Sequence, residues 1–273
     1  MSAQPGITYL DMQAYVGITK HIGGRAATDE LLSLCQIESA REVLNVGCGI
    51  GISCAYIARK HSCRVVGVDI SEKMIEWSRK RAHQERVENK VEFRVADVRD
   101  LPLEKDRFDA VLAESVIAFV DDKARAIREC VRVTRPGGYV GLNESFFTVP
   151  PTPEVSAIVR RELGVDIPLV QTWQTLWEAS GLQHRVVRLH QIDARREIQD
   201  RLQWIGARWT LQAFGRLFRL YLTQPAARQS LKAQFGSSAG SLKTMGYGIF
   251  VGRKQVLRPS GDFISRTQTR GRS

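Results

Sequence analysis

Short β-branched runs alternate with longer amphipathic segments from Glu42 onward. The short runs have the length of single strands and read EVLNV, RVVGVD, VEFRVAD, RFDAVLAES and GGYVGLNES. The segments between them have helical spacing and read ISCAYIARK, SEKMIEWSRKRAHQE and DDKARAIRECVRVT, with Ser71 as the N-cap of the second. Strands that alternate with helices imply right-handed crossovers and a parallel sheet covered on both faces. The pattern predicts an α/β doubly wound fold.

A second set of elements follows: the proline-rich FFTVPPTPE, a helix around TWQTLWEASGL, the strand HRVVRLHQI, a long helical stretch and the late strand TMGYGIFVGRK. In the long helical stretch, spacings of three and four residues predict one apolar helix face, made of Trp204, Ala207, Leu211, Phe214, Phe218 and Tyr221. An arginine ridge is predicted on another face, made of Arg201, Arg208 and Arg219, with Arg216 beside it. We expect this helix to lie on an anionic membrane or to roof a pocket for an apolar substrate; a core helix with a solvated arginine edge is the alternative.

The composition indicates a globular protein in a reducing compartment. The chain has 273 residues, 43% hydrophobic and 25% charged, which suits one large domain or a domain with a sizeable insertion. No apolar run is long enough to cross a bilayer, and the start, MSAQPGITYLDMQ, has neither a basic leader nor an apolar signal region. The five cysteines form no CxxC pair, so we expect reduced, buried thiols. We therefore expect a cytoplasmic location.

Positive charge is concentrated in the last third of the chain. Residues 1–184 contain 23 Lys or Arg against 25 Asp or Glu, whereas residues 185–273 contain 17 against 4. This asymmetry predicts an anionic partner for the C-terminal part: a membrane surface, a nucleic acid or an acidic substrate. A position at the inner membrane surface agrees with the expected cytoplasmic location.

Three glycines at alternate positions end the first predicted strand in VLNVGCGIGIS. Gly47, Gly49 and Gly51 lack a Cβ atom, so backbone N–H groups there can approach a ligand at the carboxyl end of the sheet. A tight turn without a ligand would use the same glycines. The next two strands end in Asp69 and Asp97, and carboxylates at successive strand ends indicate a clamp for a nucleoside.

A dinucleotide-binding enzyme would share the glycine loop and Asp69. Its fingerprint is GxGxxG, but this chain has Ile52 where the third glycine would stand, and a pyrophosphate would gain from glycine there. The stretches VLNVGCGIGIS, VVGVDIS, VEFRVADVRDLPLEKDRFDAVLAES and RECVRVTRPGGYVGLNE, over about residues 40–145, instead resemble the motifs of class I S-adenosylmethionine-dependent methyltransferases. The resemblance implies S-adenosylmethionine as cofactor. It also implies a seven-stranded, mostly parallel, Rossmann-like sheet with N-terminal helices and a helical insertion before the last strand.

The same resemblance implies roles for individual residues. The implied cofactor contacts, from the methionine and ribose through the adenine to the methyl-donor centre, are Gly47, Gly49, Gly51, Asp69, Ile70, Met74, Asp97, Val98, Glu114 and Ser115. Asn45 departs from the family, which usually has an acidic residue there, although an asparagine still accepts a hydrogen bond.

The segment YVGITKHIGG resembles, more loosely, the N-terminal segment of small-molecule methyltransferases that act on tocopherols and sarcosine. By that resemblance Tyr15 and His21 face the active site; a surface or core role is the alternative for His21. Glu114, Glu144 and His21 are the candidates for a general base, and a solvated loop position is the alternative for Glu144. The sequence shows no metal-ligand cluster, so no metal is expected.

These features predict an organisation and a function. We expect a helical cap over 1–39, a methyltransferase domain over 40–253 and a basic disordered tail over 254–273. Residues 145–171 and 192–243 are expected to cover the substrate. The first hypothesis is methyl transfer to the C, N or O atom of a small, apolar or lipid-like acceptor.

Two alternatives to this function remain at the level of sequence. The basic last third favours an RNA methyltransferase, but AESV stands where an NPPY-like motif would grip a base, so nucleic acid is not the expected partner. A cofactor-binding, membrane-associated protein without turnover is the other. Whether the protein is an enzyme with a lipid-like acceptor or a membrane-associated protein without turnover, residues 197–222 are the expected site of peripheral membrane contact. The sequence leaves the oligomeric state open.

Overall fold

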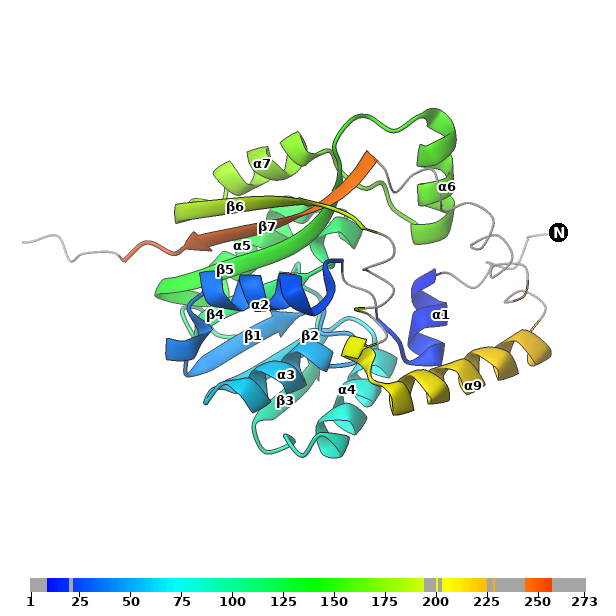
Figure 1. Cartoon of the computed structure of the whole chain (residues 1–273). Helices are drawn as coiled ribbons and strands as arrows, with labels where there is room; N and C mark the ends of the chain where they lie inside the picture. Colours follow the sequence, from blue (N-terminus) through cyan, green and yellow to red (C-terminus); the bar gives the residue numbers. More distant parts are fainter. Residues whose placement is uncertain are drawn as a thin grey trace, which may run out of the picture.

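A computed structural model of the chain describes residues 9–19, 22–193, 200, 203–224, 228 and 244–256 (Figure 1). Seven strands form one sheet in the order β3-β2-β1-β4-β5-β7-β6. The strands are β1 (Glu42–Val46), β2 (Arg64–Asp69), β3 (Val91–Val95), β4 (Phe108–Glu114), β5 (Thr134–Phe147), β6 (Gln183–Gln191) and β7 (Met245–Arg253). Neighbouring strands are parallel except where β7 lies antiparallel to β5 and β6. The predicted doubly wound, seven-stranded, mostly parallel sheet is confirmed.

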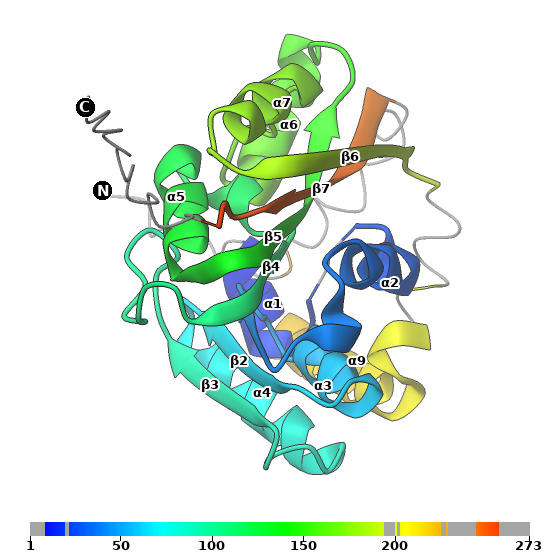
Figure 2. The same ribbon diagram turned by 90° about the vertical axis from the view of Figure 1, so that its left-hand side faces the viewer.

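Helices cover both faces of this sheet (Figure 2). They are α1 (Tyr9–Val16), α2 (Gly24–Leu34), α3 (Ile52–Lys60), α4 (Glu72–Gln84), α5 (Lys123–Val133), α6 (Pro153–Leu163), α7 (Val170–Glu178) and α9 (Ala207–Thr223), with 3-10 turns η1 (Ile37–Ser39) and η2 (Ile117–Phe119). One buried cluster joins α2, α3 and α4 to the sheet, and another joins α5, α6 and α7 to the opposite face. Helix α2, which falls within the helical cap expected over 1–39, packs in the first of these clusters.

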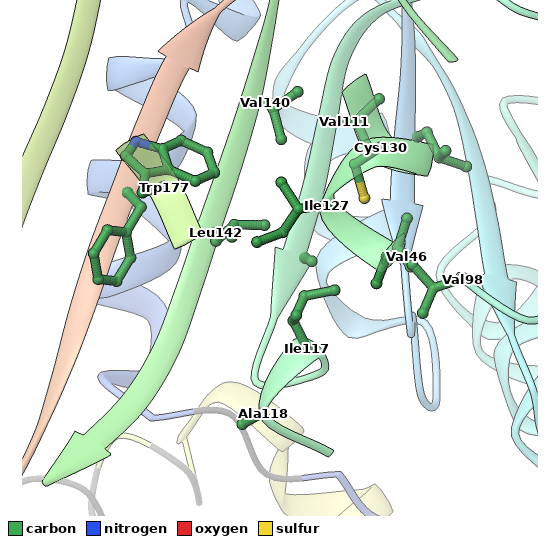
Figure 3. Close-up of a cluster of buried hydrophobic side chains, with 14 of the residues drawn as sticks. Val46, Val98, Val111, Ile117, Ala118, Ile127, Cys130, Val140, Leu142 and Trp177 are labelled. Atoms are coloured by element: carbon green, nitrogen blue, oxygen red, sulfur yellow. The ribbon is translucent and has the colours of Figure 1, made fainter. Parts of the chain in front are cut away.

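Burial on two sides explains why the central strands read as unbroken apolar runs. In β1, Val43 packs in the cluster beneath α2 and α3, whereas Leu44 and Val46 pack in the other cluster. Figure 3 shows the second cluster, where Ile127 and Cys130 of α5 meet side chains of the central strands. All five cysteines are free and buried, as predicted.

Local signals define where the helices begin. Ser71 caps α4, since its hydroxyl accepts a hydrogen bond from the Met74 N–H, as the sequence predicts. Asp122 caps α5 and Thr152 caps α6 in the same way. Helix α3 follows directly after Gly51, so the glycine loop is held between a buried strand and a helix start.

Helices α1 and α9 pack against each other beside the sheet (Figure 1). Their contact is apolar and includes Met12 and Val16 of α1 and Ala213 and Leu220 of α9. Gly206, with φ 89°, precedes the first residue of α9. The expectation of one continuous apolar face from position 204 to 221 is therefore wrong: Trp204 lies before the helix and packs edge-on against Tyr56, with ring centroids 4.9 Å apart. Among the described residues, no helix has both the length and the apolar character needed to span a bilayer.

Candidate functional site

The glycine loop lies beneath two side chains from other segments. Gly47 and Gly49 have φ values of +61° and +54°, which side chains with a Cβ rarely adopt. A Cβ at Gly47 would lie 2.3 Å from a methyl carbon of Val116, and one at Gly49 would lie 2.7 Å from Oγ1 of Thr19. Both glycines are thus required by backbone conformation and by close approach.

Asp69 lies at the end of β2 and holds the loop in place. One carboxylate oxygen accepts a 2.9 Å hydrogen bond from the Gly49 N–H, and the other accepts one of 2.9 Å from the Ser71 N–H. Burial raises the pKa of Asp69, and these two hydrogen bonds act against the rise. Each oxygen of a carboxylate has a second lone pair, so Asp69 can still accept hydrogen bonds from two ribose hydroxyls.

A small cavity lies between the loop and the end of β4. Its volume is about 20 Å³, and it is lined by Thr19, Asn45, Gly47, Cys48, Ile52, Ser53 and Glu114. That volume suits about one water molecule, so a nucleoside needs the cavity to widen. Glu114 is the one charged residue in this lining, and its carboxylate accepts a 2.5 Å hydrogen bond from the hydroxyl of Thr28 on α2.

Asn45 provides a test of whether the site fits a zwitterionic nucleoside. Its side chain is 3% exposed, and its Nδ2 group has no hydrogen-bond partner among the described residues. A buried donor without a partner costs free energy, which a ligand carboxylate in the cavity would recover. The amide oxygen can accept from an ammonium group. The glycine cradle, Asp69 and Asn45 therefore fit S-adenosylmethionine chemically, despite the departure from an acidic residue at position 45.

The segment between α1 and α2 is tied to the ends of β4 and β5. The Ile22 N–H donates to the hydroxyl of Ser115 at 3.2 Å, and the Ile22 carbonyl accepts from the Asn143 side chain at 2.7 Å. Ser115 itself has a positive φ of 56°. Sequence reasoning missed Thr19, Ile22 and Thr28, because nothing in the local pattern marks them.

The residues expected at the adenine differ in their surroundings. The Asp97 carboxylate forms a bidentate ion pair with Arg99, 2.6 Å at its shortest, which lowers the pKa of Asp97. The Val98 side chain is buried in the core, so its backbone is the part free to meet an adenine edge. Ile70 is 68% exposed, whereas Met74 is buried.

The segment around α9 covers the glycine loop and α4. Ile205 and Trp209 share a buried cluster with Ile50, Ile52 and Met74. The Trp209 indole donates a 2.6 Å hydrogen bond to the Gly17 carbonyl and stacks near Arg81, whose guanidinium lies 4.2 Å from the ring centroid. Part of the expected covering segment, residues 192–243, therefore lies against the loop, while residues 194–199, 201–202, 225–227 and 229–243 lie outside the described structure.

Glu144 has a different place from the one the sequence indicated. It lies within β5 and is fully buried, so the alternative of a solvated loop position is wrong. Its oxygens accept hydrogen bonds from the N–H groups of residues 116, 117 and 118, at 2.8 to 3.1 Å. Burial raises the pKa of Glu144 to about 7. This geometry favours an anchoring role at η2 over the general-base role expected for Glu144.

Tyr15 and His21 are the remaining sequence candidates. Tyr15 is on α1 with 41% of its surface exposed. His21 falls outside the described residues, so its role as a base stays a prediction. Within the described parts of the chain, no group of three or more His, Cys, Asp or Glu residues is arranged to hold a metal ion.

Comparison with known proteins identifies the domain. Residues 44–142 match the family model described as a methyltransferase domain. The chain is 32% identical to methyltransferase GfsG of Streptomyces halstedii, over 59% of this chain and 54% of that protein. The chain carries a methyltransferase domain over residues 44–142. Domains of this class take their methyl group from S-adenosylmethionine, in agreement with the fit at Asn45 and Asp69.

Other relatives of this methyltransferase domain match over similar lengths. A 27-O-demethylrifamycin SV methyltransferase of Amycolatopsis mediterranei is 33% identical, over 52% of this chain and 53% of that protein. The chain thus spans about half the length of the curated relatives that it matches.

Solved structures share the fold of the methyltransferase domain over nearly the whole chain. A methyltransferase from Geobacter sulfurreducens in complex with S-adenosyl-L-homocysteine has a TM-score of 0.67 at 20% identity, covering 91% of this chain and 98% of that one. The cyclase SpnF has a TM-score of 0.68 at 20% identity, covering 91% and 93%. Because one neighbour is described as a cyclase, the fold alone does not establish the reaction.

Proposed function

We propose that this protein transfers a methyl group from S-adenosylmethionine to a small, apolar or lipid-like acceptor. The observation that carries the proposal is the position of Glu114. Its buried carboxylate lies at the carboxyl end of β4 and lines the cavity that the glycine loop also borders. An acceptor bound against this carboxylate would be held beside the methyl donor.

The chain's residues divide the work of such a transfer. When bound, the sulfonium donor supplies an electrophilic methyl carbon that bonds to the acceptor as the carbon–sulfur bond breaks and its electron pair stays on sulfur. Asp69 and the loop at Gly49 hold the nucleoside, and Glu114 orients an acceptor O–H or N–H and accepts its proton where one must leave. The Thr28 hydroxyl fixes the carboxylate of Glu114 in that orientation.

Two observations support an apolar acceptor. The outer part of the covering segment brings the apolar side chains of Ile205 and Trp209 against Ile50, Ile52 and Met74, beside the glycine loop. Two relatives carry the names 27-O-demethylrifamycin SV methyltransferase and ajmaline N-methyltransferase, the second from Rauvolfia serpentina and 34% identical over 45% of this chain and 46% of that protein, whereas others are named phosphoethanolamine N-methyltransferases. Analysis of the methylated product would show whether the methyl group is bonded to carbon, nitrogen or oxygen of the acceptor.

The test is methyl transfer from labelled S-adenosylmethionine by the purified full chain. A total lipid extract and an RNA extract are incubated separately, and the label in each is counted. We expect label in the lipid fraction, and a loss of at least tenfold in Glu114→Gln, since a hydrogen bond to a charged group contributes about 1.5–3 kcal/mol. Leu189→Gln, on the far strand β6, is the matched control and should keep full activity.

Two results would replace the proposal. Label recovered only in RNA would establish the RNA methyltransferase alternative. Calorimetric binding of S-adenosylmethionine without transfer to either extract would establish a cofactor-binding protein without turnover.

A further inference from the structure

One side of α9 is apolar and exposed to solvent. Leu211 is 75% exposed and Phe218 is 64% exposed. We call the set to which they belong the outer face; its members recur at spacings of three and four residues and are Leu211, Phe214, Phe218, Tyr221 and Leu222. At about 200 Å² per side chain, the exposed part is roughly 600 Å², the upper end for the largest apolar patch on a monomer.

Contacts on the opposite side of α9 hold the helix so that the outer face points to solvent. Trp209, Ala213 and Leu220 are its buried residues, and they face α1 and the glycine loop. Arg216, which was expected beside the arginine ridge, points inward: its Nε donates a 2.6 Å hydrogen bond to the Val16 carbonyl. Its guanidinium lies 4.5 Å from the Trp77 ring centroid. Arg201 of the expected ridge lies outside the described residues. Figure 1 shows α9 at the margin of the molecule, with α1 on its inner side.

Positive charge borders the outer face. Arg208 and Arg219 are exposed along one edge of it. Arg228 donates hydrogen bonds to the carbonyls of Tyr221 and Leu222, which places a third cation at the C-terminal end of the helix. Helix α9 contains no acidic residue, and the sequence contains none between Asp200 and Asp262. The face is therefore complementary to an anionic surface.

We propose that the outer face of α9 docks on a membrane that contains anionic lipids. The aromatic and leucine side chains enter the boundary between headgroups and acyl chains, and Arg208 and Arg219 meet lipid phosphates. This combination of an apolar face and flanking cations is the pairing that gives interfacial helices their affinity. The inference goes beyond the proposed methyl transfer, because the docking surface lies on the side of α9 that faces away from the site.

A second copy of the chain fits this face less well. A two-fold contact centred on α9 would bring the same residues of both copies together. Each copy would bring Arg208 and Arg219 into the contact, with no carboxylate on either helix to neutralise their charge. An anionic membrane surface removes that repulsion.

The test is cosedimentation of the purified, nuclease-treated full chain with lipid vesicles. We expect at least tenfold stronger partition onto phosphatidylcholine mixed with phosphatidylserine than onto phosphatidylcholine alone, and weaker partition as salt rises. The double variant Phe214→Glu with Phe218→Glu should lose binding at least tenfold, because each change puts a charge into the apolar boundary. The double variant Arg208→Gln with Arg219→Gln should lose about fivefold per charge on the mixed vesicles only.

A matched control distinguishes an effect of the outer face from the effect of placing a charge elsewhere on the surface. Leu189 is 48% exposed on β6, so Leu189→Glu removes an exposed apolar side chain elsewhere and should keep wild-type partition. All substituted side chains are exposed, and thermal unfolding of each variant should match the wild type.

Several results would overturn the inference. They are no partition of the wild type onto mixed vesicles, an equal loss in the Leu189 control, or a dimer in gel filtration that only the double phenylalanine variant dissociates. Vesicle binding is measured without cofactor or acceptor, so its failure leaves methyl transfer untouched, and inactive protein that binds vesicles would count against the proposed function alone.

Discussion

The hydroxyl of Thr28 on α2 donates a 2.5 Å hydrogen bond to the carboxylate of Glu114 at the end of β4, 86 positions away in the sequence. Both side chains are buried. Thr28→Val keeps the shape and removes the donor. We expect turnover to fall about 10- to 100-fold, the scale of about 1.5–3 kcal/mol for a hydrogen bond to a charged group.

Separate measurement of kcat and of cofactor affinity distinguishes a role of Thr28 in orienting Glu114 from a simple loss of structure. Thr28→Val should lower kcat while cofactor affinity, measured by calorimetry, stays unchanged. Thr28→Ser restores the hydroxyl and should recover most of the activity. Equal activity of the valine variant and the wild type would show that Glu114 needs no partner on α2.

Asp69 predicts an unusual outcome for its conservative substitution. Both of its oxygens accept backbone N–H groups, so an asparagine must point its own NH2 group at the N–H of Gly49 or Ser71. We expect Asp69→Asn to weaken S-adenosylmethionine binding as much as Asp69→Ala does, by about 1.5–3 kcal/mol. Calorimetry on both variants measures this, and wild-type affinity in Asp69→Asn would contradict the ribose assignment.

Two glycine substitutions should change stability in opposite directions. Gly47→Ala forces a Cβ into the Val116 side chain at a positive φ, which we expect to cost about 2–4 kcal/mol of unfolding free energy. Gly215 lies within α9 with no atom within 4 Å of a Cβ placed there. Gly215→Ala should stabilise by about 0.5–1 kcal/mol. Denaturant unfolding measures both, and a neutral Gly47→Ala would mean that Val116 yields easily.

Glu144 should make stability depend on pH near neutrality. Burial raises its pKa to about 7 from the ordinary value of 4.5, so the folded state holds a proton that the unfolded chain releases. This contribution is fully present below pH 4.5 and is lost as pH rises through 7, by about 3 kcal/mol over the window. The difference between wild type and Glu144→Gln in thermal unfolding across this range reports it. A difference that does not change with pH would show that Glu144 does not titrate there.

The parallel half of the fold could be predicted from the sequence because its signals are local. The strand EVLNV and the helix ISCAYIARK coincide with β1 and α3, since burial on both faces makes the strand continuously apolar and Gly51 marks the start of the helix. The N-cap at Ser71 was predicted for the same reason. The places of Gly49 and Asp69 in the candidate site follow from these elements.

Long-range contacts account for what the sequence could not predict. The periodicity of α9 predicts that apolar residues share one side of the helix, but it does not show which side is buried. That depends on α1, whose Val16 carbonyl accepts a hydrogen bond from Arg216. Thr19 and Thr28 look like ordinary threonines, and only the folded chain brings them to Gly49 and Glu114. Glu144 reads as a strand-end acid, and three backbone N–H groups of η2 make it an anchor.

The bonds from α9 to the α1 region have a consequence for folding. Trp209 and Arg216 bind carbonyls that precede them by 192 and 200 residues, so a ribosome releases these side chains long after β1 to β5 have left it. Closing so long a loop carries the entropy cost of distant contacts, while the sheet forms from nearer ones. During synthesis the nucleotide-binding strands can therefore assemble first, and the helical covering is added over them later.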